Sequence, residues 1–184
     1  MYFCIEVERS LCNQSQTHET QQHKMRIVIQ RVTEASVTIV KAGDETQAQS
    51  TDKKRSIGQG YCILLGVCEE DTKEDVEWLV RKVVGLRVFD DEKGIMNRSI
   101  MEVGGDCLVV SQFTLFASYK KGNRPSWLRA ARHEISVPLY ELFCRQLSEA
   151  IGRPVATGEF GAEMKVSLTN DGPVTICMDT KNKE

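Results

Sequence analysis

The chain has 184 residues, of which 41% are hydrophobic and 27% are charged, and its formal net charge is -2. These values fit a single domain with a sizeable core and exclude a polycationic chain, so a nucleic acid would have to bind at a local basic patch. The seven cysteines form an odd count without a Cys-x-x-Cys pair, which favours buried free thiols in a reducing compartment over disulfides or structural zinc. No apolar run approaches the roughly 20 residues that cross a bilayer. We therefore expect a cytoplasmic protein without a membrane segment.

The N-terminal part of the chain changes character before the first patterned segment. Residues 1–24 end in a polar stretch rich in Gln, Thr and His, which predicts a disordered N-terminal extension. A single domain is then expected over residues 25–184. Alternating apolar residues predict strands over 25–32 and 35–40. Residues 41–56 are polar and contain a run of three basic residues, so we expect an extended hairpin loop there.

The rest of the chain alternates between strands and two amphipathic helices. Asp71 and Glu74 fit the capping box of the first helix, and Ser136 fits the cap of a second helix that ends at Gly152. Apolar patterns predict strands over residues 61–67, 86–89, 107–110, 162–168 and 174–178. Strands outnumber helices, and several are joined by turns. We therefore expect an α+β fold, with a mainly antiparallel or mixed, barrel-like β-sheet and two amphipathic helices packed on it.

The strand at residues 107–110 leads into small polar residues and then into a basic segment. Ser111-Gln112-Phe113-Thr114 follows the strand directly. No acidic residue lies between Ser118 and Arg132, and the basic residues there are Lys120, Lys121, Arg124, Arg129 and Arg132. This layout suits a site that handles a polyanion carrying a reactive group. The alternative is that the hydroxyls bond to backbone and that Lys120 and Lys121 lie in a solvated loop.

The common hydrolytic constellations are missing from the sequence. Two of the three histidines, His18 and His23, lie in the predicted extension, and His133 lies among basic residues, where a surface or phosphate-facing position suits it better than a role as general base. There is no Gly-x-Ser-x-Gly elbow, no glycine-rich nucleotide loop and no cluster of metal-ligating residues. The sequence therefore predicts no metal and no other cofactor.

Seven short motifs occur in order from residue 25 to residue 175. They are MRIVIQRV at 25–32, LLGV at 64–67, MNRS at 96–99, SQFTLFA at 111–117, KGNRPS at 121–126, FGAEM at 160–164 and NDGPVT at 170–175. Together they resemble the D-aminoacyl-tRNA deacylase family, and the resemblance extends to about residue 179. It leaves residues 1–24 and the loop at 43–56 without a counterpart.

The resemblance implies a substrate, a reaction and an assembly. The substrate would be a tRNA whose terminal adenosine carries a D-amino acid or a mischarged glycine. The reaction would be hydrolysis of that ester, with L-aminoacyl-tRNA rejected. The protein would be a homodimer with its active site at the subunit interface, and a cis Gly172-Pro173 pair would reach into the partner's pocket.

Hydrolysis of this substrate depends on positioning, because an aminoacyl ester is already activated and needs no strong base. The candidate catalytic residues are Ser111, Gln112 and Thr114, as donors to the developing oxyanion. The resemblance suggests an attacking water assisted by the ribose 2′-hydroxyl of the substrate. Thr114 as a nucleophile stays open, although no base lies near it in the sequence to activate it.

The remaining candidates bind or select the substrate. Carbonyls of Gly172 and Pro173 would hold the α-ammonium so that an L side chain clashes with main chain, and Arg31 would hold that turn in place. Phe113, Phe160, Gly161, Ala162 and Met164 would line the pocket, and Lys120, Lys121, Arg124, Arg129 and Arg132 would contact tRNA phosphates. Two alternatives are a non-catalytic nucleic-acid-binding protein on the same scaffold and a paralogue with a trans Gly-Pro turn and relaxed chirality.

Overall fold

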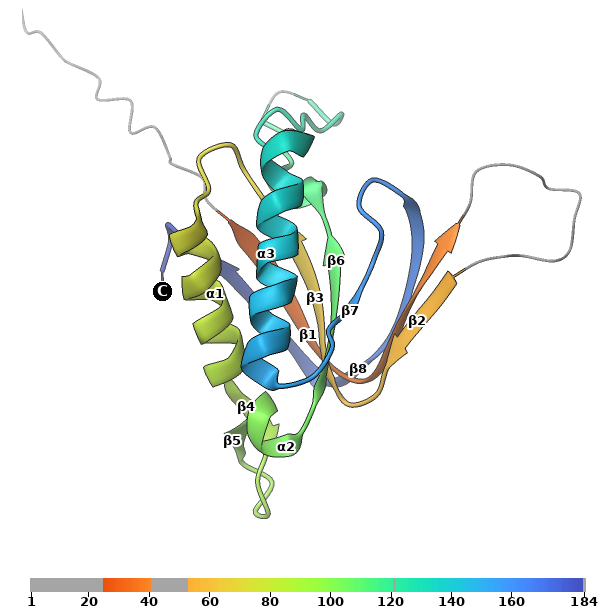
Figure 1. Cartoon of the computed structure of the whole chain (residues 1–184), viewed down its shortest axis with the longest axis vertical. Helices are drawn as coiled ribbons and strands as arrows, with labels where there is room; N and C mark the ends of the chain where they lie inside the picture. The colour runs from red at the N-terminus through yellow and green to blue at the C-terminus, as the bar shows by residue number, and fades with distance from the viewer. Residues whose placement is uncertain (1–24, 41–52, 121, 184) are drawn as a thin grey trace, which may run out of the picture.

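The computed structural model describes residues 25–40, 53–120 and 122–183. One mixed sheet of six strands forms the body of the molecule (Figure 1). The strands are β1 (Arg26–Val40), β2 (Lys53–Ile57), β3 (Gly60–Gly66), β6 (Asp106–Ser111), β7 (Ala156–Thr157) and β8 (Glu163–Asp179). β1 pairs antiparallel with β2, β3 and β8, whereas β6 runs parallel to β3 and to β7. β1 is therefore the central strand, and the expected mixed sheet is confirmed.

β1 bends in its middle and curls the sheet into a nearly closed, barrel-like shape. Its pairing with β8 slips in register twice between residues 30 and 34. Before the slip, Ile27 and Ile29 pack in the larger core cluster; after it, Ala35 and Val37 pack in a second, smaller one. A bulge has this effect because one extra residue bends the strand and moves the following side chains to the other face.

Two predicted strand pairs are in fact single long strands. The segments expected at 25–32 and 35–40 are the two halves of β1, and those expected at 162–168 and 174–178 are the two halves of β8. The apolar pattern breaks at each bend because the buried face changes there. The residues between the two halves of each strand therefore look like a turn in the sequence, whereas the strand continues through them with a bend.

Helices α1 and α3 cover one face of the sheet (Figure 1). α1 (Lys73–Gly85) buries Val76, Leu79, Val80 and Val83, and α3 (His133–Ile151) buries Leu139, Tyr140, Phe143, Leu147 and Ile151. Smaller elements are the β4–β5 hairpin (Arg87–Asp90 and Met96–Ser99), the short helix α2 (Ile100–Val103) and the 3-10 helix η1 (Phe113–Phe116). The prediction of two amphipathic helices on a barrel-like sheet is confirmed. None of the helices in the described part of the chain is long and apolar enough to cross a membrane.

Both predicted helix caps are wrong. The capping box of α1 consists of Thr72 and Asp75, whose carboxylate accepts from the Thr72 backbone N–H at 3.0 Å. Asp71 instead accepts from the backbone N–H groups of Met25 at 2.6 Å and Cys68 at 2.7 Å, so it joins β1 to the loop before α1. α3 begins at His133, three residues before Ser136. Ser136 therefore lies inside the helix, where its hydroxyl donates to the Arg132 carbonyl at 2.8 Å.

The expected loop at residues 41–56 needs a correction at its end. Residues 53–57 form β2, which pairs with residues 35–39 of β1. Arg55 does not lie at a solvated tip, since its guanidinium donates to the Thr157 hydroxyl at 2.8 Å and the Gly158 carbonyl at 3.1 Å. The predictions for residues 1–24 and 41–52 lie outside the described residues, as does Lys121.

Candidate active site

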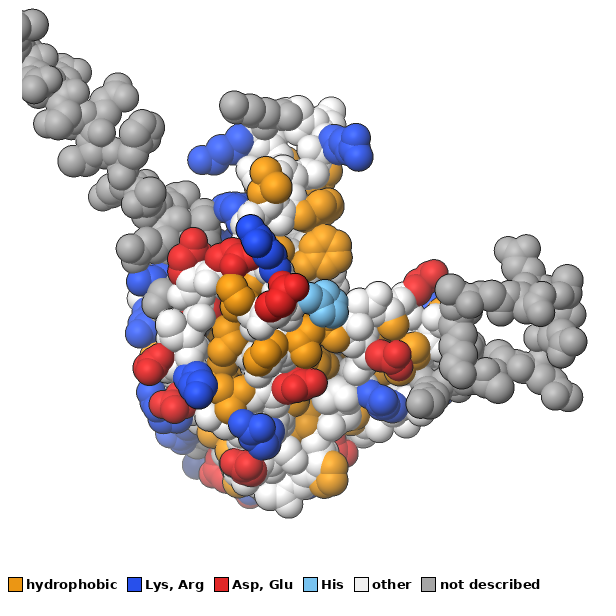
Figure 2. Space-filling model, turned by 45° about the horizontal axis from the view of Figure 1, so that its top comes forward, with side chains coloured by type: hydrophobic (Ala, Val, Ile, Leu, Met, Phe, Trp, Pro, Cys, Tyr) orange, Lys and Arg blue, Asp and Glu red, His pale blue; other side chains and the backbone are white. Residues whose placement is uncertain are grey.

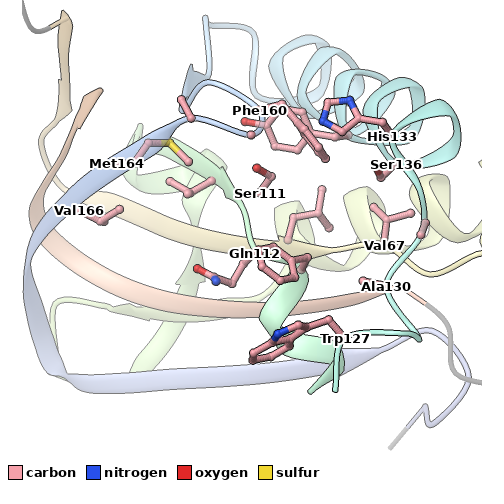
Figure 3. Close-up of a pocket in the computed structure, with 17 residues that line it drawn as sticks. Val67, Ser111, Gln112, Trp127, Ala130, His133, Ser136, Phe160, Met164 and Val166 are labelled. Atoms are coloured by element: carbon pink, nitrogen blue, oxygen red, sulfur yellow. The ribbon is translucent and has the colours of Figure 1, made fainter. Parts of the chain in front are cut away.

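A cavity of about 590 Å³ opens at the ends of β3 and β6, beside the N-terminal half of α3 and the segment that begins β8 (Figure 3). Val110 of the smaller core cluster and Met164, which packs against that cluster, both line the cavity. Its lining residues are Leu65, Val67, Val110, Ser111, Gln112, Phe113, Trp127, Ala130, Ala131, His133, Ser136, Tyr140, Phe160, Gly161, Ala162, Met164 and Val166. The walls are largely apolar, with a few polar groups, as is usual for a small-molecule site.

The fold brings two distant motifs together in this cavity. Ser111 and Gln112 come from the end of β6, whereas Phe160 and Gly161 come from the loop before β8. In Figure 3, Ser111 lies among the lining residues with Phe160 and His133 on one side. All five residues predicted to line the pocket do so: Phe113, Phe160, Gly161, Ala162 and Met164.

The end of β6 turns at once into η1, which orients the polar groups. Gln112 donates its backbone N–H to the Leu65 carbonyl at 2.7 Å, and its side-chain amide donates to the Thr114 hydroxyl. Thr114 does not line the cavity. The backbone N–H groups of Phe113 and Thr114 begin η1 and have no acceptor among the described residues.

Aromatic rings form the wall opposite η1. Phe160 meets His133 edge to face at 4.7 Å between centroids and meets Tyr140 at 5.8 Å. The Tyr140 hydroxyl donates to the Val109 carbonyl at 2.9 Å, and burial raises the pKa of Tyr140, so its hydroxyl stays neutral. Gly161 has a φ of +76°, and a Cβ there would lie 3.4 Å from the His133 Nε2. A glycine therefore suits this part of the wall.

The Gly172-Pro173 turn lies at the bend of β8 and does not line the cavity of its own chain. Its peptide bond is cis, as the resemblance implied, and not trans as the relaxed paralogue required. The buried Arg31 donates to the Asp171 carbonyl at 3.1 Å and to the Val88 carbonyl at 2.6 Å. The turn is thus exposed to solvent, and the buried Arg31 fixes the residue before it.

The predicted basic residues lie on a projecting segment, which we call the basic arm (residues 117–132, Lys121 excepted). Ser118 and Ser126 pair across it through two backbone hydrogen bonds of 2.9 and 2.8 Å. Lys120 and Arg124 are exposed and belong to no ion pair among the residues described. Arg129 donates to the Ala117 carbonyl at 2.8 Å, and the exposed Arg132 lies 3.7 Å from Glu69. The arm projects from the rest of the molecule beyond the exposed His133, the pale blue side chain in Figure 2.

Several lining residues were not among the predicted site residues. Trp127, Ala130 and Ala131 come from the arm, and Ser136 and Tyr140 from the first half of α3. The signal for Trp127 in the sequence is a large aromatic residue within a basic segment. His133 is exposed, as expected, but it also lines the cavity.

Four cysteine thiols of the described chain are not activated as nucleophiles. Burial raises the pKa of Cys62 to about 11 and that of Cys144 to about 12, and it also raises the pKa of Cys68 and Cys107. These thiols are therefore protonated at neutral pH. Across residues 25–40, 53–120 and 122–183, no group of three or more His, Cys, Asp and Glu side chains could hold a metal ion.

Comparison with known proteins gives consistent matches. A D-aminoacyl-tRNA deacylase of Bacteroides thetaiotaomicron is 62% identical over 160 residues, and one of Phocaeicola vulgatus is 60% identical; each match covers 87% of this chain and 100% of the relative. A solved structure described as c-Myc DNA Unwinding Element Binding Protein is 42% identical with a TM-score of 0.70, covering 83% of this chain and 97% of that one. A probable eukaryotic D-amino acid tRNA deacylase shares the fold at a TM-score of 0.68 and 18% identity, covering 84% and 98%.

The chain is thus an α+β protein with a barrel-like sheet and a largely apolar candidate site at the end of one strand. A family model identifies the chain more specifically. Residues 28–179 match the family model of D-Tyr-tRNA(Tyr) deacylase. The chain belongs to that family.

Proposed function

We propose that this chain hydrolyses the ester bond of D-aminoacyl-tRNAs and of mischarged glycyl-tRNA, releasing the amino acid and the tRNA, and that it rejects L-aminoacyl-tRNA. The observation that carries the proposal is the meeting of the SQF and FGAEM motifs in one cavity. Relatives about 60% identical over their whole length carry the name of this activity. The cavity size fits a terminal adenosine with its amino acid.

The proposed reaction proceeds by direct attack of water on the ester carbonyl. The water oxygen bonds to the carbonyl carbon, and the carbonyl oxygen becomes an oxyanion near the Phe113 N–H, which has no acceptor among the described residues. Collapse breaks the bond to the ribose oxygen, which takes up the proton that the water loses through the neighbouring 2′-hydroxyl. Ser111 and Gln112 position the ester, and the Thr114 hydroxyl acts through its hydrogen bond with Gln112.

Chiral selection is proposed to require a second copy of the chain. The Gly172-Pro173 turn is absent from the cavity lining of its own chain, yet it is exposed and held by Arg31. In a homodimer with the active site at the interface, the partner's turn would present its carbonyls to the substrate ammonium. An L side chain would then meet main chain, whereas a D side chain or glycine would fit. The exposed apolar residues Val166 and Leu168 on β8 support such an interface.

Lys121 and four residues of the basic arm are proposed to contact tRNA phosphates; the four are Lys120, Arg124, Arg129 and Arg132. Such contacts give affinity with little sequence preference, and they weaken as salt rises. We also propose that the protein works in the cytoplasm, where the free cysteines of the described chain stay reduced.

A deacylation assay tests the proposal directly. Purified protein is mixed with tRNA esterified to D-tyrosine, glycine or L-tyrosine, and the remaining ester is counted over time. Hydrolysis of the D and glycine esters with the L ester intact is the expected result. A protein that leaves the D ester intact would disprove the enzymatic function.

A non-catalytic nucleic-acid-binding protein is the second candidate. It is favoured by the structural neighbour whose description names DNA binding and by the exposed cations of the arm. Binding of deacylated tRNA or single-stranded DNA at similar affinity, without turnover of any ester, would select this candidate.

A further inference from the structure

An aromatic surface continues outward from the mouth of the cavity. Phe113 and Trp127 both line the cavity and meet edge to face at 5.5 Å between ring centroids. They nevertheless remain 56% and 39% exposed, and farther along the arm Tyr119 is 76% and Leu128 93% exposed. Large apolar residues gathered on an exposed surface indicate a binding site, because burying them in a partner is favourable.

The charges around this surface indicate the chemistry of the partner. Residues 117–132 contain five Lys and Arg residues and no Asp or Glu, although the whole chain has a net charge of -2. Figure 2 shows hydrophobic side chains along the arm with Lys and Arg side chains to both sides. Aromatic platforms flanked by cations are typical of sites for single-stranded nucleic acid, where bases stack and phosphates pair with the cations.

We propose that Trp127 stacks against an unpaired base of the tRNA 3′ end, next to the terminal nucleotide that enters the cavity. The identity of the RNA rests on the proposed function. The ring is placed for this role because the arm is fastened on both sides of it: Ser118 pairs with Ser126, and the Ala131 N–H donates to the Val67 carbonyl at 2.9 Å. The Phe113–Trp127 contact makes the platform continuous with the cavity.

A second copy of the chain is a less suitable occupant of this surface. Two copies of the arm would bring like charges together, because the segment holds no acidic residue. The apolar residues Val166 and Leu168, which lie on β8 and not on the arm, suit contact between copies better.

The first test uses the fluorescence of Trp127 itself and does not depend on catalysis. The chain has two tryptophans, so Trp78→Phe leaves Trp127 as the sole reporter. Deacylated tRNA with its unpaired 3′ nucleotides should quench the fluorescence saturably, and the same tRNA trimmed of those nucleotides should not. Equal quenching by both RNAs, or by neither, would overturn the proposal.

The second test compares affinities of otherwise unchanged proteins. Trp127→Ala should weaken binding of the untrimmed tRNA about tenfold and leave binding of the trimmed tRNA unchanged, because one stacked base is lost. Trp127→Phe should recover most of the affinity. The control Ile95→Ala removes an exposed apolar residue of the β4–β5 hairpin, outside the arm, and should change neither. Equal weakening for both RNAs would show a structural effect and would contradict stacking.

Kinetics separate this inference from the proposed function. Trp127→Ala should raise KM about tenfold more for D-aminoacyl-tRNA than for D-aminoacyl-adenosine, with little change in kcat on the tRNA, because only the tRNA carries the stacked base. Equal loss on both substrates would count against the inference. Absence of turnover by the unmodified protein would refute the deacylase function, and the two binding tests would still decide whether Trp127 stacks.

Discussion

Gly172 is the position where one methyl group is expected to cost the most activity. A Cβ there would lie 2.9 Å from the Val174 Cγ2 and 3.0 Å from the Arg31 Nη2, and the residue has a φ of +119°. Arg31 would have to move, and the backbone conformation is unfavourable for any residue with a side chain, at about 1–3 kcal/mol. Gly172→Ala should therefore lower kcat/KM for the D ester at least about tenfold.

Thr114 provides the comparison for this prediction. Its hydroxyl accepts from the Gln112 side chain and lies outside the cavity lining, so Thr114→Ala removes one hydrogen bond worth about 1 kcal/mol. Its effect on kcat/KM should be smaller than that of Gly172→Ala. An equal or larger loss, together with an acyl-enzyme trapped and found by mass spectrometry, would show that Thr114 is a nucleophile.

Asp71 should make stability depend on pH in the direction opposite to that of an ordinary surface carboxylate. Burial raises its pKa from 3.8 to about 6 in the folded state, despite hydrogen bonds from the backbone N–H groups of Cys68 and Met25. Between pH about 4 and about 6 the folded chain keeps this proton and the unfolded chain loses it, so folding becomes less favourable as pH rises. The expected contribution is about 3 kcal/mol.

The measurement is the free energy of unfolding by urea at several pH values, for the unmodified chain and for Asp71→Asn. The difference between the two proteins should fall from pH 4 to pH 6 and stay level above that range, because the asparagine side chain of the variant does not titrate. A flat or rising difference would contradict the raised pKa. The substitution also removes hydrogen bonds, but that cost is the same at every pH. It therefore does not affect how the difference in the free energy of unfolding changes with pH.

At the scale of elements, the start of α1 depends on Asp75 and not on Asp71. Its carboxylate accepts from both the backbone N–H and the hydroxyl of Thr72 at 3.0 Å. Asp75→Ala should cost about 1–2 kcal/mol in the free energy of unfolding, because an orphan N–H is left at the helix end. Glu77→Ala, an exposed change in the same helix, should be close to neutral. Equal effects of the two changes would refute the cap.

Local pattern predicted which elements exist better than where they begin. The stripe of Val76, Leu79 and Val83 was enough to predict α1, since helix periodicity is a local property. The cap of α1 was misplaced because the Asp71 carboxylate accepts a hydrogen bond from the Met25 N–H, a contact between residues far apart in the chain. β2 was missed for a similar reason: polar residues at 53–56 become a strand by pairing with β1.

The candidate site was predictable to the extent that its motifs are contiguous. Ser111 to Phe113 and Phe160 to Met164 were identified from the family resemblance, and the fold places most of them in the cavity. Trp127 and His133 reach the same cavity only after the arm folds back on Val67, which no local pattern predicts.

At the scale of the whole molecule, the cavity and the Gly172-Pro173 turn lie on different parts of one chain. Gly172 and Pro173 do not line the cavity of their own chain. If each active site combines the cavity of one subunit with the turn of its partner, two variants that are each strongly impaired should complement each other. The first variant, Ala162→Trp, fills the cavity; the second, Gly172→Ala, distorts the turn.

In a mixed dimer of these two variants, both defects fall on one site, and the other site combines an intact cavity with an intact turn. Random mixing in equal amounts makes about half of the dimers mixed, each with one of its two sites intact, so about a quarter of normal D-ester hydrolysis should return. The measurement is the deacylation rate after the two proteins are unfolded and refolded together, with each variant refolded alone as the control. If the mixture stays as inactive as its components while size measurements show dimers, the turn does not complete the partner's site.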